Sequence, residues 1–520
     1  MRNKALLICF CFPFLVGCGL FTPQTRSESS NNNSSFSIEP YSGEESSSSN
    51  SSSKEEEDET VTPKNNPHYP VTIEEQPPVT WDSTQANLRK GIKTLDFYNV
   101  NDIHGIIDED DNYAGIRKIS SYLKSRQTGN PNGYVFTSSG DSWQGSADSN
   151  MTRGALMDDW LSYVDCSAMA LGNHEFDWTI DTLVENELAA DFPFLACNII
   201  RSDNHEVVDW VRPFTTITRN GINIGIIGAI GENIMPTILA SNIRGLSFAD
   251  PLPYVTQWSN YLKDNGADII LFLYHYTTNG LSNQYVSLVD GVFGGHSHSF
   301  ENNTLDYVPA VQASAYGRAL AHINLRYDFD ANEVSSSYGE IISSDVIKSY
   351  GEDSGTNDLI DSYADEIITI KNEKVAYIPY SIGGNNLIEL MEKYMYAYYL
   401  EELNNPVTLY CVRHNQARQS LPSGYVTYGD IYASFPFDNN LVLTKSDYRY
   451  ANQHAYTSYC PNGEDPSLVK DSNGDVYLLT IDYLAEHETY GQYLTTLTTY
   501  TGMYPRDIMK MYLGNDFPLV

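Results

Sequence analysis

The stretch LDFYNVNDIHG (residues 95–105) joins a short apolar run to a cluster of polar residues. Its first part, residues 95–100, has the aromatic and branched composition that favours a β-strand. Its second part carries Asp102 and His104, which are separated by one residue and can face one point where the strand opens into a loop. Open α/β sheets place their active sites at the carboxyl ends of their strands. The stretch therefore predicts a functional strand end in an α/β domain.

Five more short apolar runs follow along the chain, separated by segments of helical or irregular character. They are residues 134–137, 168–171, 222–229, 269–273 and 289–293. Short strands that alternate with such segments predict an α/β layered domain.

All of these runs except 222–229 lead into polar motifs, most of them in glycine-rich turns, which let the backbone approach a ligand closely. The motifs GDSWQGS, GNHEFDW, YHYTTNG and GGHSHS supply Asp141, Asn173, His174, Asp177, His275, His296 and His298. Each motif alone is a weak signal. Together they predict that many ligand-type side chains converge on one edge of the domain.

The convergent side chains predict a site for two divalent metal ions. The candidate ligands are Asp102, His104, Asp141, Asn173, His275, His296 and His298. A mixed nitrogen and oxygen set without thiolate suits Mn, Zn or Fe better than Cu(I). Two metals with a bridging carboxylate can activate water and neutralise charge during displacement at phosphorus. The sequence therefore favours metal-dependent hydrolysis of a phosphate ester.

His174 and Asp177 form a second kind of candidate, a pair for proton transfer. They lie three residues apart, close enough on a turn for the carboxylate to orient the imidazole and support its charged form. An imidazole so placed can stabilise transition-state charge or protonate the leaving group.

Length and charge limit the remaining possibilities. The 520 residues allow two or three domains. A formal net charge of −36 argues against binding a nucleic-acid polymer, since such proteins neutralise phosphates with basic patches. Of the seven cysteines, Cys166, Cys197, Cys411 and Cys460 remain for the folded protein, and four residues permit three pairings between which the sequence does not choose.

The first residues carry a targeting signal. Arg2 and Lys4 precede an apolar run too short to span a bilayer, and the run ends in LVGC, which resembles the lipobox of bacterial lipoproteins. We expect a signal peptide at 1–17 and a lipidated Cys18 that anchors the protein to the outer face of a bacterial cell membrane. Residues 18–88 are rich in Ser, Asn and Glu and predict a flexible tether. The domains expected beyond it are 89–327 (catalytic), 328–374 (connector) and 375–520 (substrate). The connector contains a candidate helix at 357–370, and the substrate domain contains an amphipathic segment at 386–400 and strand candidates at 407–412 and 476–481.

The ordered motifs DxHG, GDxxQGS, GNHEFD, a strand-end His and GHSH resemble those of the 5′-nucleotidase/UDP-sugar hydrolase family of calcineurin-like metallophosphoesterases. A later segment, YGDIYASFPFDNN (428–440), is similar to that family's C-terminal substrate domain. The resemblance implies a four-layer αββα catalytic domain, a helical connector and a second α/β (α+β) substrate domain.

The resemblance also implies roles for individual residues. One metal would be held by Asp102, His104, Asp141 and His298, and the other by Asp141, Asn173, His275 and His296. His174 and Asp177 would be the catalytic dyad, and Arg418, Phe437 and Tyr483 would contact the substrate.

The departures from the family pattern concern the substrate more than the reaction. Arg413 stands where the family has Asn, the segment 482–493 replaces a GGDGY motif, and no other substrate arginine is found before Asn386. The small residues that flank the fourth-motif histidine are also changed in YHYTTNG. We expect a 5′-nucleotidase-like phosphomonoesterase. The alternatives are a 2′,3′-cyclic-nucleotide phosphodiesterase, a nucleotide-sugar pyrophosphohydrolase and an inactive surface binding or adhesion lipoprotein.

Overall fold

The computed structural model describes residues 79–403, 405, 407–455, 459–463, 465–487 and 489–519. Two compact units make up this part of the chain: the first comprises the residues up to Ile367 together with Glu486 and His487, and the second comprises Ile368–Ala485 and the residues from Thr489 onward. The predicted signal peptide, Cys18 and most of the predicted tether lie outside the described residues.

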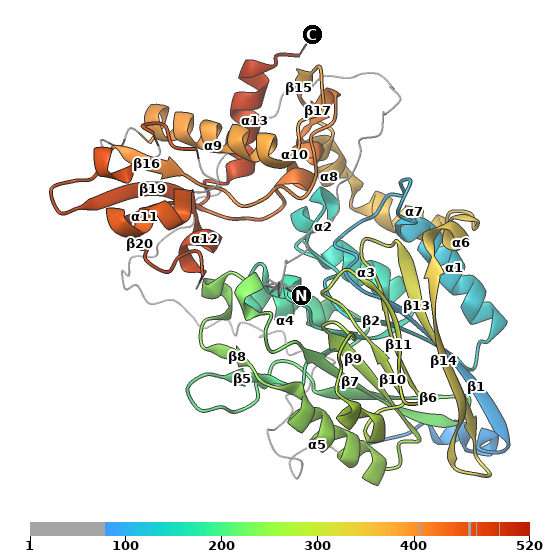
Figure 1. Cartoon of the computed structure of the whole chain (residues 1–520). Helices are drawn as coiled ribbons and strands as arrows, with labels where there is room; N and C mark the ends of the chain where they lie inside the picture. The colour runs from blue at the N-terminus through green and yellow to red at the C-terminus, as the bar shows by residue number, and fades with distance from the viewer. Residues whose placement is uncertain are drawn as a thin grey trace, which may run out of the picture. The chain divides into compact units, whose positions relative to one another are not determined.

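The first unit contains two six-stranded sheets (Figure 1). In spatial order, the first sheet consists of β14 (Glu333–Ser343), β13 (Ala319–Asp328), β1 (Ile92–Val100), β2 (Tyr134–Ser138), β3 (Cys166–Ala170) and β4 (Phe194–Leu195). The second consists of β11 (Phe300–Leu305), β12 (Val308–Ala313), β10 (Gly291–Phe293), β9 (Ile269–His275), β7 (Ile222–Ile230) and β6 (Phe214–Arg219). The short strands β5 (Ile199–Arg201) and β8 (Leu246–Phe248) pair separately.

The strands that precede the polar motifs run parallel within each sheet. β1, β2, β3 and β4 pair in parallel, as do β7, β9, β10 and β12. Their carboxyl ends therefore share an edge in each sheet, as the sequence predicts. All six predicted strands form, with ends displaced by a few residues at most.

Side chains alternate between two cores along each strand. In β1, Leu95 and Phe97 face the core between the sheets, whereas Tyr98 and Val100 face the core beneath the helices. This alternation follows from the two-residue period of a strand.

Helices cover the outer face of each sheet. Residues of α1 (Gly115–Gly129) and α3 (Ala155–Tyr163) share the outer core of the first sheet, and α5 (Pro251–Asp264) shares that of the second. The resulting layers are helix, sheet, sheet and helix, which is the expected αββα arrangement. The unit also contains α2 (Ala147–Met151), α4 (Ile180–Ala189) and α6 (Ser344–Lys348).

Two segments differ from the expectation in detail. Residues 79–88, the end of the predicted tether, lie on the first unit: the Trp81 indole donates to the Asn265 carbonyl at 2.9 Å. The helix expected over 357–370 is two helices, α7 (Ser354–Ser362) and α8 (Ala364–Lys371), which are separated at Tyr363. The Tyr363 hydroxyl donates to Asp159 and its ring packs against the outer core of the first sheet, so a tertiary contact interrupts the helix.

The second unit is built around a four-stranded sheet. Its strands, in spatial order, are β16 (Leu409–Val412), β19 (Asp475–Ile481), β18 (Leu441–Asp447) and β20 (Thr495–Tyr500). β15 (Lys374–Ile378) pairs with β17 (Gly424–Thr427), and the helices are α9 (Gly384–Glu401), α10 (Tyr428–Ser434), α11 (Tyr448–Ala455), α12 (Asp482–Glu486) and α13 (Pro505–Asp516). Three elements predicted here, the helix at 386–400 and the strands at 407–412 and 476–481, correspond to α9, β16 and β19.

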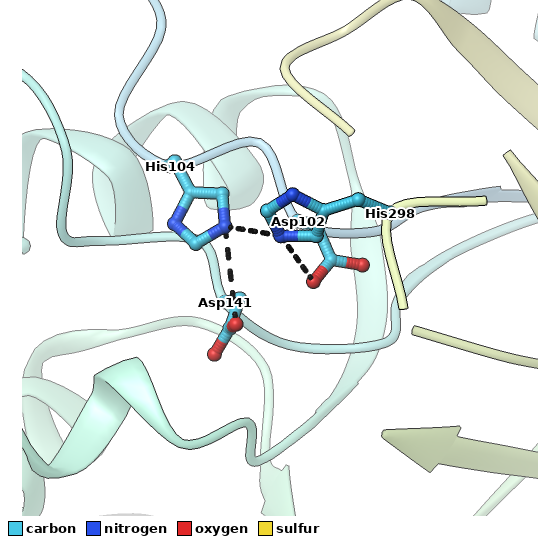
Figure 2. A group of neighbouring side chains, drawn as sticks. All are labelled: Asp102, His104, Asp141 and His298. Carbon is cyan, nitrogen blue, oxygen red and sulfur yellow. Dashed lines mark hydrogen bonds and ion pairs between the residues drawn. The ribbon is translucent and has the colours of Figure 1, made fainter. Parts of the chain in front are cut away.

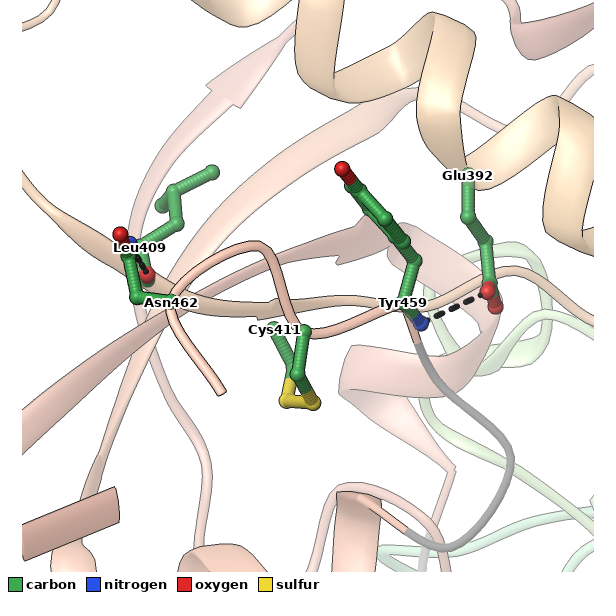
Figure 3. The surroundings of a disulfide bond; sticks show 6 residues. Glu392, Leu409, Cys411, Tyr459 and Asn462 are labelled. Carbon is green, nitrogen blue, oxygen red and sulfur yellow. Dashed lines mark hydrogen bonds between the residues drawn. A yellow bond between two sulfur atoms is a disulfide. The ribbon is translucent and has the colours of Figure 1, made fainter. Parts of the chain in front are cut away.

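Cys411 and Cys460 form a disulfide within this unit (Figure 3), while Cys166 and Cys197 are buried thiols. Beside the disulfide, the buried Glu392 carboxylate accepts hydrogen bonds from the backbone N–H groups of His414 (3.0 Å) and Tyr459 (2.9 Å). Burial raises the pKa of Glu392 to about 7.

Among the described residues, no helix combines the length and the apolar character needed to cross a bilayer.

Candidate functional site

The predicted metal ligands meet where the carboxyl ends of the two sheets come together. Asp102 and His104 follow β1, Asp141 follows β2 and Asn173 follows β3, all from the first sheet. His275 ends β9, and the loop between β10 and β11 carries both His296 and His298, all from the second sheet.

One group consists of Asp102, His104, Asp141 and His298, whose side chains point toward a common centre (Figure 2). Their possible ligand atoms all lie within 4.8 Å of one another. His104 Nε2 lies 3.0 Å from His298 Nε2 and 3.9 Å from Asp141 Oδ2. His298 Nε2 lies 3.5 Å from Asp102 Oδ1. Two imidazoles and two carboxylates at these separations form a set that could hold a divalent cation.

The second group shares Asp141 with the first and adds His275 and His296. His275 Nε2 lies 3.4 Å from Asp141 Oδ2 and 3.2 Å from Asn173 Oδ1, which is also 2.8 Å from His296 Nδ1. Asn173 therefore belongs to this group by position. A carboxylate common to both groups is the arrangement that a bridged pair of metals needs.

Backbone carbonyls fix the tautomers of two imidazoles. His104 Nδ1 donates to the Gln144 carbonyl at 2.9 Å, and His275 Nδ1 donates to the Ser139 carbonyl at 2.6 Å. A carbonyl can only accept, so in the neutral imidazole each Nδ1 carries the proton and each Nε2 turns its lone pair toward the cluster. Metal-binding histidines are oriented by this kind of contact. The donor set therefore fits a metal centre.

The charge states of Asp141 and His296 suit a bound cation, whereas His275 would have to lose a proton to coordinate one. Although the carboxyl is buried, the neighbouring His275, His174 and His104 hold the pKa of Asp141 well below its usual range, so it is ionised. Burial lowers the pKa of His296 to about 4, which leaves its imidazole neutral and able to coordinate. Burial acts in the same direction on His275, but the attraction of Asp141 outweighs it and raises the pKa of His275 to about 10.

The backbone is strained at most of these positions. The φ angles of Asp102, His104, Asp141, His296 and His298 are 51°, 51°, 53°, 69° and 55°. The left-handed region costs a residue with a Cβ roughly 1–2 kcal/mol. Strain of this kind persists where the surrounding structure imposes it, and it is concentrated at functional sites.

A glycine allows the third ligand loop to approach the second. A Cβ on Gly172 would lie 2.3 Å from Asp141 Oδ1 and 2.7 Å from the His275 ring. No side chain fits there, which explains the glycine at the start of GNHEFD.

His174 and Asp177 lie beside the first group. His174 Nδ1 is 2.7 Å from Asp177 Oδ2, and the two side chains are 7% and 13% exposed. The His174 backbone N–H donates to Asp141 Oδ1 at 2.8 Å, and its ring centroid lies 5.1 Å from that of His104. The pair is therefore held close to the predicted ligands.

The predicted substrate residues all belong to the second unit. The Arg418 guanidinium lies 5.1 Å from the centroid of the Phe437 ring, a cation–π contact. Tyr483 lies in α12. Arg413 lies 5.4 Å from the ring of Tyr490, a residue that the sequence did not single out.

Residues 95–300 match the family of calcineurin-like phosphoesterases. The chain has a metallophosphoesterase domain. Both groups of candidate metal ligands lie within the matched segment, and members of the family use two divalent metals.

Known proteins with similar sequences or folds include 5′-nucleotidases. The chain is 28% identical over 268 residues to the 5′-nucleotidase of Diplobatis ommata, covering 45% of this chain and 46% of that protein. Identity to the snake venom 5′-nucleotidase of Crotalus adamanteus is 24% over 315 residues, covering 54% and 53%. The chain thus spans about half the length of these curated relatives.

A crystal structure of a 5′-nucleotidase precursor from Thermus thermophilus has a similar fold. Its TM-score is 0.64 at 18% identity, and the match covers 82% of this chain and 97% of that chain. At this identity the likeness shows the fold alone, and it extends beyond the phosphoesterase domain to both units.

Sequence reasoning missed several residues that support the ligands of the phosphoesterase domain. The Glu175 carboxylate, 1% exposed, accepts the backbone N–H groups of Asp141 (2.9 Å), Ser142 (2.8 Å) and Gly172 (2.7 Å). Burial and the nearby Asp141 raise the pKa of Glu175 to about 7. Its place inside GNHEFDW was the available signal.

Asn101 and Tyr316 were also missed. Asn101 Nδ2 donates to Asp102 Oδ2 at 2.7 Å, and its position directly before Asp102 was a signal. The Tyr316 ring lies 5.2 Å from His104 and 5.3 Å from His298. Tyr316 is far from both residues in the sequence, so no local pattern could have found it.

Proposed function

We propose that this chain is a two-metal phosphoesterase that hydrolyses nucleotides to nucleoside and phosphate, in the manner of a 5′-nucleotidase. The observation that carries the proposal is the convergence of two ligand groups on the shared Asp141, with the His174–Asp177 pair beside them. The 5′-nucleotidase relatives support nucleotides as the substrate class.

Asp102, His104, Asp141 and His298 would hold one divalent metal, and Asp141, Asn173, His275 and His296 the other. When bound, the metals supply Lewis acidity at phosphorus and a nucleophile activated at neutral pH. His174 is hydrogen-bonded to Asp177 through Nδ1. Its other ring nitrogen, Nε2, would therefore donate a proton to the leaving oxygen. Asp177 stabilises the imidazolium form that this transfer requires.

Arg418 and Phe437 supply a fixed cation and an aromatic face, which suit a phosphorylated nucleoside. Tyr483 is the candidate for a second stacking ring. These assignments rest on the resemblance and on the Arg418–Phe437 contact.

The test is phosphate release by the purified full chain, with Mn²⁺ or Zn²⁺ and after chelation. The panel should contain nucleoside monophosphates, cyclic nucleotides, nucleotide sugars and bis(4-nitrophenyl) phosphate, with Asp141→Ala as the inactive reference. Metal-dependent turnover of the monophosphates would support the proposal. Turnover of diesters alone would make the protein a phosphodiesterase, and silence across the panel would favour a binding role.

We also propose that the protein acts outside the cytoplasm, anchored to a bacterial cell membrane through lipid on Cys18. The LVGC motif after an apolar run supports this placement. Cys18→Ser should abolish incorporation of radiolabelled palmitate and release the protein from the membrane fraction. Unchanged labelling would contradict the anchor.

A further inference from the structure

A buried glutamate links the loop that follows His275 to the loop that carries His296 and His298. Glu301 is the second residue of β11 and is 2% exposed. One loop follows His275 and has the unusual sequence YTTNG, and the other is the loop between β10 and β11, with His296 and His298. The carboxylate accepts five hydrogen bonds from these two loops.

The two carboxylate oxygens of Glu301 divide these bonds. Oε1 accepts from the hydroxyls of Thr277 (2.7 Å) and Ser297 (2.8 Å), and thereby joins one loop to the other. Oε2 accepts from the Thr278 backbone N–H (2.7 Å), the Thr278 hydroxyl (2.7 Å) and the Asn279 backbone N–H (3.1 Å).

These contacts lie very near the predicted ligands in the sequence. Thr277 and Thr278 follow His275 by two and three residues, and Ser297 stands between His296 and His298. We propose that Glu301 is a positioning residue, whose carboxylate sets the placement of His275 relative to His296 and His298 for metal binding. The inference rests on the two-metal part of the proposed function.

Neighbouring side chains reinforce the same link. Asn303, two residues along β11, donates to the Thr278 hydroxyl and to Asn279 Oδ1, both at 3.0 Å. Gln312, which pairs with Glu301 in the sheet register, donates to the Ser297 hydroxyl at 2.6 Å. β11 and β12 therefore present a polar surface that fits both loops.

The loops are also in close contact with each other. A Cβ on Gly294 would lie 2.6 Å from the Thr278 methyl group and 3.0 Å from the Tyr276 carbonyl oxygen. Thr278 thus contacts the start of the GGHSHS loop directly. The changed residues after the fourth-motif histidine have their partner in Glu301, because the Thr277 and Thr278 hydroxyls both donate to it.

A positioning role predicts weaker metal binding when the carboxylate is lost. Changes to residues that orient metal ligands typically cost about 10- to 100-fold in metal affinity. Glu301→Ala removes all five bonds, so we expect Mn²⁺ affinity to fall by at least about 10-fold. Glu301→Gln can keep its oxygen at the Oε2 position for the two backbone N–H groups, and its amide can donate to the Thr277 and Ser297 hydroxyl oxygens. Its Mn²⁺ affinity should stay close to that of the wild type.

The experiment is a titration of the metal-free full chain with Mn²⁺, following free Mn²⁺ by electron paramagnetic resonance. Glu333→Ala, an exposed glutamate of β14, is the matched control, and the melting temperature of each metal-free variant is recorded. Loss of affinity in Glu301→Ala with recovery in Glu301→Gln would support the inference. If Glu301→Ala does not fold, Thr277→Val should still weaken Mn²⁺ binding, because it removes one of the two bonds at Oε1.

Two outcomes would overturn the inference. The first is an unchanged Mn²⁺ affinity in Glu301→Ala, or in Thr277→Val if Glu301→Ala does not fold. The second is an equal loss of Mn²⁺ affinity in Glu301→Gln and Glu301→Ala. A lower melting temperature with normal Mn²⁺ affinity would make Glu301 purely structural. If the expected Mn²⁺ pattern is found in a chain that hydrolyses no phosphate ester, the inference stands and the proposed function fails.

Discussion

Asp177→Asn separates the acid role of His174 from the role of the metals. Asn has the shape of Asp, and its Oδ1 can still accept the hydrogen bond that His174 Nδ1 donates at 2.7 Å. The substitution removes the negative charge that stabilises the imidazolium form. Because the two side chains are only 7% and 13% exposed, solvent screens this interaction weakly.

The expected loss follows from the strength of a hydrogen bond between charged groups. Such bonds contribute about 1.5–3 kcal/mol, which corresponds to roughly 10- to 150-fold in rate. The retained neutral bond places Asp177→Asn near the lower limit, so we expect kcat for a nucleoside monophosphate to fall about 10-fold. KM should change little, because the lost interaction operates in the transition state.

The assay compares two substrates that differ in leaving group. A nucleoside alcohol leaves poorly without a proton, whereas 4-nitrophenolate leaves readily as an anion, so the loss should be much smaller with 4-nitrophenyl phosphate. Metal content, measured by plasma mass spectrometry, should equal that of the wild type, and Asp181→Asn in the first turn of α4 is the matched control. Equal losses on the two substrates, or none on either, would refute the acid role of His174.

Three other predictions address the second unit. Phe437→Ala should raise KM for nucleoside monophosphates about fivefold through lost stacking and leave KM for glycerol phosphate, which has no ring, unchanged. Burial raises the pKa of Glu392 from 4.5 to about 7, so the stability that its protonated form contributes is fully present below pH 4.5. About 3 kcal/mol of this stability should be lost as the pH rises through 7. In urea unfolding measured across this pH range, Glu392→Gln should not show this loss. Replacing both Cys411 and Cys460 by Ser removes a disulfide that spans 49 residues and should lower the free energy of unfolding by about 4 kcal/mol. Equal free energies of unfolding for the oxidised and the reduced wild type would contradict this.

The elements that the sequence predicted correctly are those set by local pattern. β1, β2 and β9 are apolar runs followed by polar motifs. β1 pairs in parallel with β2 in the first sheet and β9 with β7 in the second, which explains why ligands separated by many residues meet at the carboxyl ends of the strands. Asp141 lies in both groups, and its predicted role as the bridging ligand stays a prediction. The substrate has no comparable local pattern.

What the sequence could not predict depends on contacts formed across the fold. The break at Tyr363 comes from packing against the outer core of the first sheet, since nothing in the local pattern stops the helix there. The Cys411–Cys460 pair was one of several possible pairings. Glu301 resembles any strand residue until β11 lies against the ligand loops, and the left-handed backbone at His298 is uncommon for any residue other than glycine.

Each metal group combines side chains from both sheets, and this sets a limit on when a metal can be captured. The first group needs residues 102 and 298 together, so it cannot exist until nearly the whole domain has been synthesised and its sheets have docked. A complete set of ligands for an ion is therefore available only at the end of folding. The identity of the bound ion would be decided by the ions available in the compartment where folding finishes, rather than by those where the chain is made.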